Sequence, residues 1–158
     1  MKTIKVKTSE LTGAALDWAV MKLDPMCDGL EWLFDSDSGY FFGVCDNDDV
    51  EKMKCILLPH KLSLKDRITY RRKGLDFYSP STNWNYAGKL IDVYQVGISC
   101  PGTEMPPAPL KDWVAGVGIH CRHCMTGSTA LIAICRAIVA SKIGDTVEVP
   151  EQLVGVKS

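Results

Sequence analysis

One stretch near the C-terminal end decides the fold: Thr126-Gly127-Ser128-Thr129-Ala130-Leu131-Ile132-Ala133-Ile134-Cys135-Arg136-Ala137-Ile138-Val139-Ala140-Ser141-Lys142-Ile143-Gly144-Asp145. Apolar side chains recur in it at the i, i+3, i+4, i+7 and i+8 spacing of one helix face, namely at Leu131, Ile134, Cys135, Ile138 and Val139. The opposite face is apolar as well, and a helix that is apolar on all sides is normally buried. The stretch therefore predicts the central core helix of the protein.

Both ends of this predicted helix carry residues that limit helices. Ser128 or Thr129 can cap its start, because a side-chain oxygen can accept a first-turn N–H group. Gly144 can end it, since glycine adopts the left-handed conformation without strain. Arg136 is the one long charged side chain in the middle of the helix, so we expect it to need a partner in the folded protein.

Length and composition are those of an ordinary globular protein, and we expect residues 1–158 to form a single domain. The apolar fraction is 46% and the charged fraction 23%. A formal net charge of −1 does not favour broad nucleic-acid binding, which depends on a positive excess. No apolar run approaches the roughly 18 residues that span a bilayer, and the charged start of the chain does not resemble a signal peptide.

Seven cysteines are present, an odd number: Cys27, Cys45, Cys55, Cys100, Cys121, Cys124 and Cys135. The odd number, the expected lack of an export signal and one cysteine inside the core helix together indicate reduced thiols. We therefore expect a cytoplasmic protein.

Alternation and helical spacing predict the elements of the first third of the chain. Residues 4–7 alternate as a half-buried strand. A helix begins near Ala14, with apolar residues on one face and Asp17 projecting away from that face. The aromatic-rich segments 31–34 and 39–45 favour two strands joined by a turn.

The later segments add further predicted strands. Residues 78–88 are interpreted as a polar loop, residues 89–99 and 113–119 as strands, residues 100–109 as a mobile loop, and residues 146–150 as a short strand or extended tail. Strands mixed with two helices, without regular alternation, indicate an α+β fold. We expect a mainly antiparallel sheet with a buried C-terminal core helix and an N-terminal helix packed on one side of it.

Three segments carry a resemblance to a known family. They are Lys7-Thr8-Ser9-Glu10-Leu11-Thr12-Gly13-Ala14-Ala15-Leu16-Asp17-Trp18-Ala19-Val20, then Tyr78-Ser79-Pro80-Ser81-Thr82-Asn83-Trp84, then Gly127 to Gly144 with Val147-Glu148-Val149-Pro150. In this order they resemble the NinX-like family of small lambdoid phage and prophage proteins of unknown function. The family's core helix usually begins Gly-Pro-Thr-Pro, whereas here Gly127-Ser128-Thr129-Ala130 keeps the capping hydroxyls and loses the prolines. The resemblance implies a phage accessory protein in the bacterial cytoplasm and brings no catalytic motif.

A candidate ligand-binding site combines the 78–84 loop with the start of the core helix. Its nine predicted residues are Tyr78, Ser81, Thr82, Asn83, Trp84, Ser128, Thr129, Arg71 and Arg72. The aromatic rings can stack on a planar base, and a helix start with nearby arginines suits an anion. This set matches a nucleotide-like ligand. The alternative is a loop held by its own turns, with Trp84 as a plug of the core.

Metal and catalytic motifs are weak by comparison. His120, Cys121, His123 and Cys124 resemble half of a zinc site, but structural zinc takes four ligands. Cys45, Cys55, Cys100 and His60 supply no second close pair, so we predict surface thiols, with neither metal nor other cofactor. No nucleophile elbow, Walker loop or dinucleotide fingerprint occurs, so the sequence does not favour an enzyme.

These observations predict a phage accessory protein that sequesters a small nucleotide-derived ligand, for which countering bacterial immune signalling is one use. A first alternative is a module that binds a host protein through Tyr40-Phe41-Phe42 or Trp113. A second is a nucleic-acid accessory protein that uses the basic residues 52–73. We expect no membrane partner, and a homo-oligomer remains open.

Overall fold

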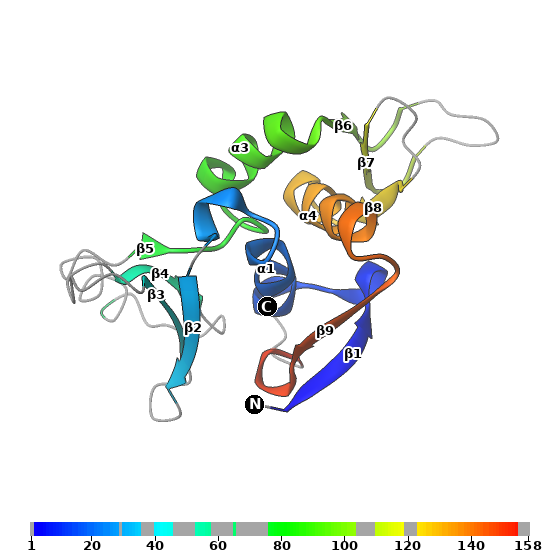
Figure 1. Ribbon diagram of the computed structural model, residues 1–158. Coiled ribbons are helices and arrows are strands. Elements are labelled where there is room, and N and C mark those ends of the chain that lie inside the picture. The colour runs from blue at the N-terminus through cyan, green and yellow to red at the C-terminus, as the bar shows by residue number, and fades with distance from the viewer. Residues whose placement is uncertain are drawn as a thin grey trace.

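The computed structural model describes residues 2–28, 30–35, 40–45, 53–57, 65, 76–103, 110–118 and 123–154. The described elements, in chain order, are β1 (Thr3–Lys7), η1 (Thr8–Glu10), α1 (Gly13–Met21), η2 (Pro25–Cys27), β2 (Leu30–Asp35), β3 (Tyr40–Cys45), β4 (Met53–Leu57), β5 (Asp76–Phe77), α3 (Trp84–Tyr94), β6 (Val96–Ser99), β7 (Trp113–Val117), β8 (Met125–Gly127), α4 (Ala130–Lys142), β9 (Thr146–Pro150) and η3 (Glu151–Leu153). Figure 1 shows their arrangement, and it confirms the α+β class.

Helix α4 is the central core helix that the sequence predicts. Its positions 133–135 and 137–139 are fully buried, and it packs against β7, β8, α1 and α3. Thr129 caps its start, where the side-chain Oγ1 accepts the Ile132 N–H at 3.2 Å. Gly144 follows its end with a φ of +112°, which an L side chain rarely adopts.

Arg136 finds its partners on the main chain. Its Nε donates to the Leu11 carbonyl at 2.9 Å, and Nη1 donates to the Thr126 carbonyl at 2.8 Å. Burial lowers the pKa of this guanidinium, which remains a cation because its normal pKa is so high. The side chain thereby ties α4 to the segment before α1 and to β8.

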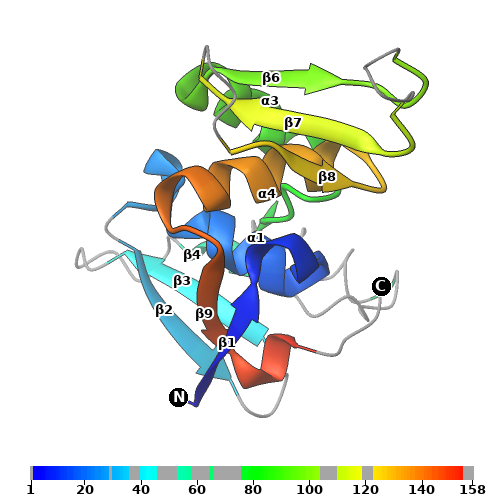
Figure 2. The ribbon, with the colours of Figure 1, turned by 90° about the vertical axis from the view of Figure 1, so that its right-hand side faces the viewer.

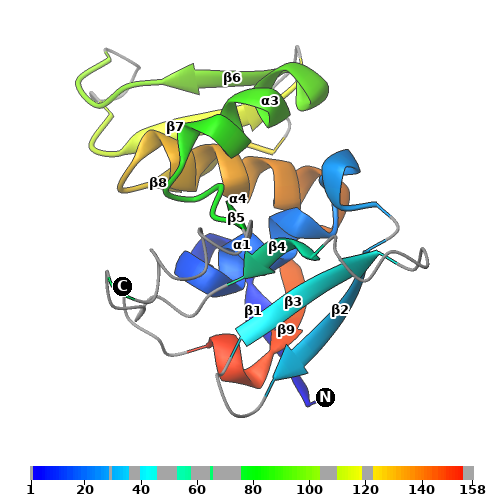
Figure 3. The ribbon, with the colours of Figure 1, turned by 90° about the vertical axis from the view of Figure 1, so that its left-hand side faces the viewer.

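The strands that the structure describes form three separate sheets rather than one. Their orders are β1-β9, β2-β3-β4-β5 and β6-β7-β8, and within the described residues all pairings are antiparallel except β4 with β5. Figures 2 and 3 show β6, β7 and β8 on one side of α4, with α1 and the other two sheets on its opposite side. A helix that is apolar all round must be covered on both sides, so α4 lies between β6-β7-β8 and the rest of the fold rather than on one side of a single sheet.

Helix α1 is buried along its whole length, which the sequence analysis did not anticipate. All nine residues from Gly13 to Met21 are buried, and the Trp18 ring lies 4.8 Å from the Phe41 ring between centroids. Asp17, which was expected to project away from the apolar face, is itself buried, because it is only 3% exposed.

The segment expected to be a loop followed by a long strand is instead helix α3 and the short strand β6. Asn83 begins the helix, since its Oδ1 accepts the Asn85 N–H at 3.0 Å. Ala87 and Leu90 lie three residues apart and are both buried, as a helix face requires. Gln95 ends the helix in the left-handed region with φ 52°.

Several predicted features lie outside the described residues. These include most of the basic stretch 52–73 and most of the loop 100–109. Strand β4 falls inside the basic stretch. Among the helices that the structure describes, none has the length and apolar character needed to cross a membrane.

Candidate binding site at the start of α3

The loop that precedes α3 is held to the core by two buried side chains. The Tyr78 hydroxyl donates to Asp24 Oδ2 at 2.7 Å, and the Ser81 N–H donates to Asp17 Oδ1 at 2.7 Å. Tyr78 and Ser81 are 2% and 3% exposed, so they anchor the loop and do not face a ligand at the surface. Burial, reinforced by the charge of Asp24, raises the pKa of Tyr78 far above its usual range, so the phenol stays a hydrogen-bond donor.

Asp17 is the most unusual ionisable group in this anchor. Burial raises its pKa from 3.8 to about 7, although the Ser81 N–H and the nearby Ser81 hydroxyl act in the opposite direction. The hydroxyl itself makes no hydrogen bond of normal geometry to any residue in the described ranges. The same carboxyl contributes to the raised pKa of the buried Cys135 thiol, for which burial is the larger cause. The Asp17 carboxyl of α1 therefore interacts with two other parts of the fold. It accepts a hydrogen bond from the loop and acts electrostatically on Cys135 in the middle of α4.

The part of the site nearest the surface consists of Thr82 and Trp84, which are exposed, and Asn83, which is half-buried. Trp84 is the first residue of α3 and is 54% exposed, which rules out its role as a plug of the core. Within the described part of the chain, its ring has no aromatic neighbour and its Nε1 no hydrogen bond. The carbonyl of Asn83 accepts the N–H groups of Tyr86 and Ala87, each at 3.2 Å, in addition to the side-chain cap. Asn83 therefore already accepts three of the N–H groups at the start of α3, those of Asn85, Tyr86 and Ala87.

Ser128 and Thr129, predicted to join the site, are both exposed at the start of α4. Figures 2 and 3 show that α3 and α4 begin on the same side of the molecule. The Thr129 hydroxyl is used for capping, and a Cβ at Gly127 would lie 2.5 Å from the Ala133 nitrogen, so β8 packs closely on the first turn of the helix. Arg71 and Arg72 lie outside the described residues.

Of the zinc-like cluster, His123 and Cys124 are exposed, whereas His120 and Cys121 lie outside the described residues. The described ranges contain no group of three or more histidine, cysteine or acidic side chains placed to hold a metal ion.

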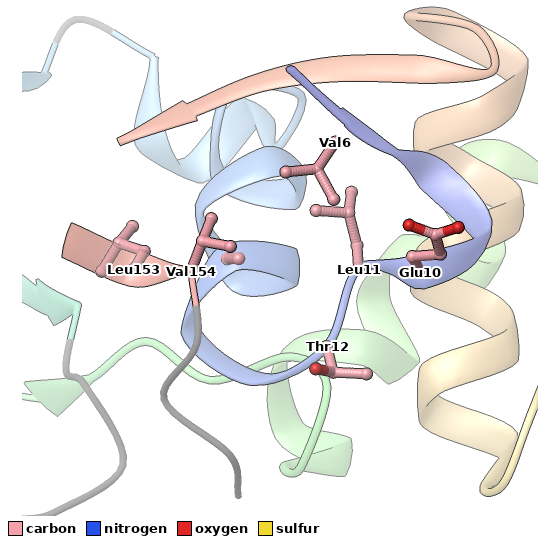
Figure 4. Close-up of a pocket in the computed structure, with 7 residues that line it drawn as sticks. Val6, Glu10, Leu11, Thr12, Leu153 and Val154 are labelled. Atoms are coloured by element: carbon pink, nitrogen blue, oxygen red, sulfur yellow. The ribbon is translucent and has the colours of Figure 1, made fainter. Parts of the chain in front are cut away.

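A small cavity that the sequence analysis did not foresee lies between β1, the start of α1 and η3. It measures about 80 Å³ and is lined by Val6, Glu10, Leu11, Thr12, Ala15, Leu153 and Val154 (Figure 4). This volume holds about two or three water molecules. Ligand sites for drug-sized molecules usually measure roughly 300 Å³ or more, so the cavity does not suit a nucleotide.

The fold and this surface define a small α+β protein that displays one aromatic ring at the end of an anchored polar loop. The family model described as "Bacteriophage P22, NinX" matches residues 7–142, which is most of the chain. The chain therefore belongs to the bacteriophage P22 NinX family. Nothing among the curated proteins matches it.

Proposed function

We propose that this phage protein binds and sequesters a small nucleotide-derived molecule at the start of α3. The exposed indole of Trp84 carries the proposal, because it is a large apolar ring that the fold leaves uncovered at a position set by a helix. A base can stack on such a ring with useful affinity, and every base has a face that permits it. Thr82 and Asn83 supply polar groups beside the ring.

The anchoring of the loop supports binding without a large entropic penalty. Asp17 and Asp24 hold Ser81 and Tyr78 through hydrogen bonds of 2.7 Å, so the chain that leads to Trp84 is ordered before a ligand arrives. A site that is already ordered loses less conformational entropy on binding, which increases affinity.

Sequestration rather than catalysis is favoured by the position of the perturbed groups. Asp17 and Cys135, whose pKa values are strongly raised, are both enclosed in the core, where a substrate does not reach them. Membership of a phage family makes the cytoplasm of an infected bacterium the proposed place of action, and a bacterial immune signal the proposed class of target.

Native mass spectrometry of protein purified from bacterial lysate tests the proposal. We expect an excess of a few hundred daltons over the denatured mass, consistent with the size of a nucleotide, and its loss in Trp84→Ala. Val93→Ala is the matched control, because Val93 is another apolar residue of α3 and is 55% exposed. The proposal fails if no excess is found with either infected or uninfected lysate, or if Trp84→Ala keeps it.

A protein partner is the second candidate, on a different surface from the one first expected. Phe41 of the Tyr40-Phe41-Phe42 segment is fully buried, and Trp113 is half-buried against the core. Met26 is instead 57% exposed, and Lys89 Nζ lies 3.6 Å from its Sδ. Val93 lies one helical turn beyond Lys89, so the apolar side chains of Met26 and Val93 flank this lysine on the surface.

A further inference from the structure

Helix α3 contains a glycine for which the fold gives no reason. Gly88 is the fifth of eleven residues in the helix, and its φ lies in a region that other residues adopt readily. Among the residues that the structure describes, a Cβ added there would meet nothing within 4 Å. Glycine inside a helix lowers stability relative to alanine, because it loses more backbone entropy on folding. Gly127 differs, since a Cβ at that position would collide with the first turn of α4.

The position of Gly88 relative to Trp84 suggests a reason. Residues i and i+4 of a helix lie on the same face, and helical side chains lean toward the N-terminus. A side chain at position 88 would therefore extend over the flank of Trp84. Glycine leaves this flank of the exposed indole open.

We propose that Gly88 keeps a space beside Trp84 for the planar heterocycle of the ligand, which stacks on the indole above the bare helix backbone. This inference rests on the proposed function and names the part of the ligand that the site recognises. The start of α3 is already satisfied by Asn83, so it has little left to offer a phosphate. The ring end of the nucleotide, rather than its phosphate end, is what this surface binds.

The surroundings of the indole fit a small planar ring better than a protein surface. The exposed residues of α3 other than Trp84 are the polar Asn85, Lys89 and Asp92 and one apolar residue, Val93, which follows Trp84 by nine positions. Centres of protein interfaces are instead depleted of charge and rich in packed aromatic and aliphatic side chains. One isolated aromatic ring in a polar field, with a side-chain-sized gap beside it, matches a single stacked base.

Gly88→Ala tests the inference, because stability and binding should change in opposite directions. The variant, Trp84→Ala and wild type are incubated with a protein-free small-molecule extract of the host bacterium, and the retained mass is followed by native mass spectrometry. We expect Gly88→Ala to raise the melting temperature by about 3 °C and to reduce the apparent affinity about tenfold. Asp92→Ala is the control, since it alters an exposed position of the same helix one turn further from Trp84 and should keep the mass.

Other results would overturn the inference in recognisable ways. If Gly88→Ala is more stable than wild type and retains the mass equally well, Gly88 has no role in binding. The proposed function is not affected by that result. A lower melting temperature would show that the glycine is required by the fold. If wild type retains no mass from the extract, the proposed function and the inference fall together.

Discussion

Replacing the buried Asp17 by asparagine should change how stability depends on pH. The pKa of Asp17 is about 7 in the folded protein and 3.8 when unperturbed, so the unfolded chain releases this proton first as pH rises. Stability from the protonated carboxyl is therefore complete below pH 4 and is lost as pH rises to about 7. A shift of about 3 pKa units corresponds to roughly 4 kcal/mol, which is an upper figure for this one group.

The Asp17→Asn variant keeps an oxygen that can accept the Ser81 N–H but carries no ionisable group. We expect the unfolding free energy of wild type to fall relative to that of the variant by up to about 4 kcal/mol between pH 4 and pH 8. The variant should be the more stable protein at pH 8. Urea denaturation at a series of pH values measures both free energies.

Wild type and Asp17→Asn share all other titrating groups. The contributions of these groups to the pH dependence therefore cancel in the difference between the two unfolding free energies. Asp92→Asn is the control for the loss of a carboxylate, because Asp92 is exposed on α3. If the difference between wild type and Asp17→Asn is independent of pH, the buried carboxyl does not titrate between pH 4 and pH 8.

Three further changes test the anchors around the site. Tyr78→Phe leaves an oxygen of Asp24 without its donor and should cost about 1–3 kcal/mol in urea unfolding, whereas an unchanged midpoint would contradict the hydrogen bond. Thr129→Ala removes the cap of α4 and should cost about 1 kcal/mol, measured by thermal unfolding, with Thr129→Ser retaining most of the stability. Gly127→Ala brings a Cβ to 2.5 Å from the Ala133 nitrogen and should lower the melting temperature clearly; a stabilised variant would refute this packing.

The elements that the sequence predicted are those in which all local signals indicate the same type of structure. Helix α4 was found because its apolar spacing, its capping Thr129 and its terminal Gly144 agree with one another. Strand β1 was found because Ile4 and Val6 alternate with lysines, and the segment 146–150 proved to be its partner strand β9. Local propensity and the final structure point the same way in these segments, which is why they could be predicted.

Helix α3 was missed because its signals conflict. Gly88 resembles the end of a loop, yet it lies in the middle of a helix whose burial is set by Ala87 and Leu90. Asp17 was misplaced for a different reason: an acidic residue is normally assigned to the water-facing side of a helix, and only tertiary packing shows that α1 has no such side. The polar character of the loop before α3 can be recognised in the sequence. Which of its residues face inward cannot, because this depends on the long-range hydrogen bonds of Tyr78 and Ser81.

The pairing of β1 with β9 has a consequence for the order of folding. Thr3 lies opposite Pro150 and Lys7 opposite Thr146, while Thr8 is tied to the end of α4 through the Gly144 carbonyl. Strand β1 therefore has no strand partner during synthesis until residues 146–150 have been made. Contacts between such distant segments form slowly, because the entropy of closing a long loop is lost before the contacts stabilise it. Until β9 is made, the exposed apolar face of β1 is a site at which the nascent chain can aggregate.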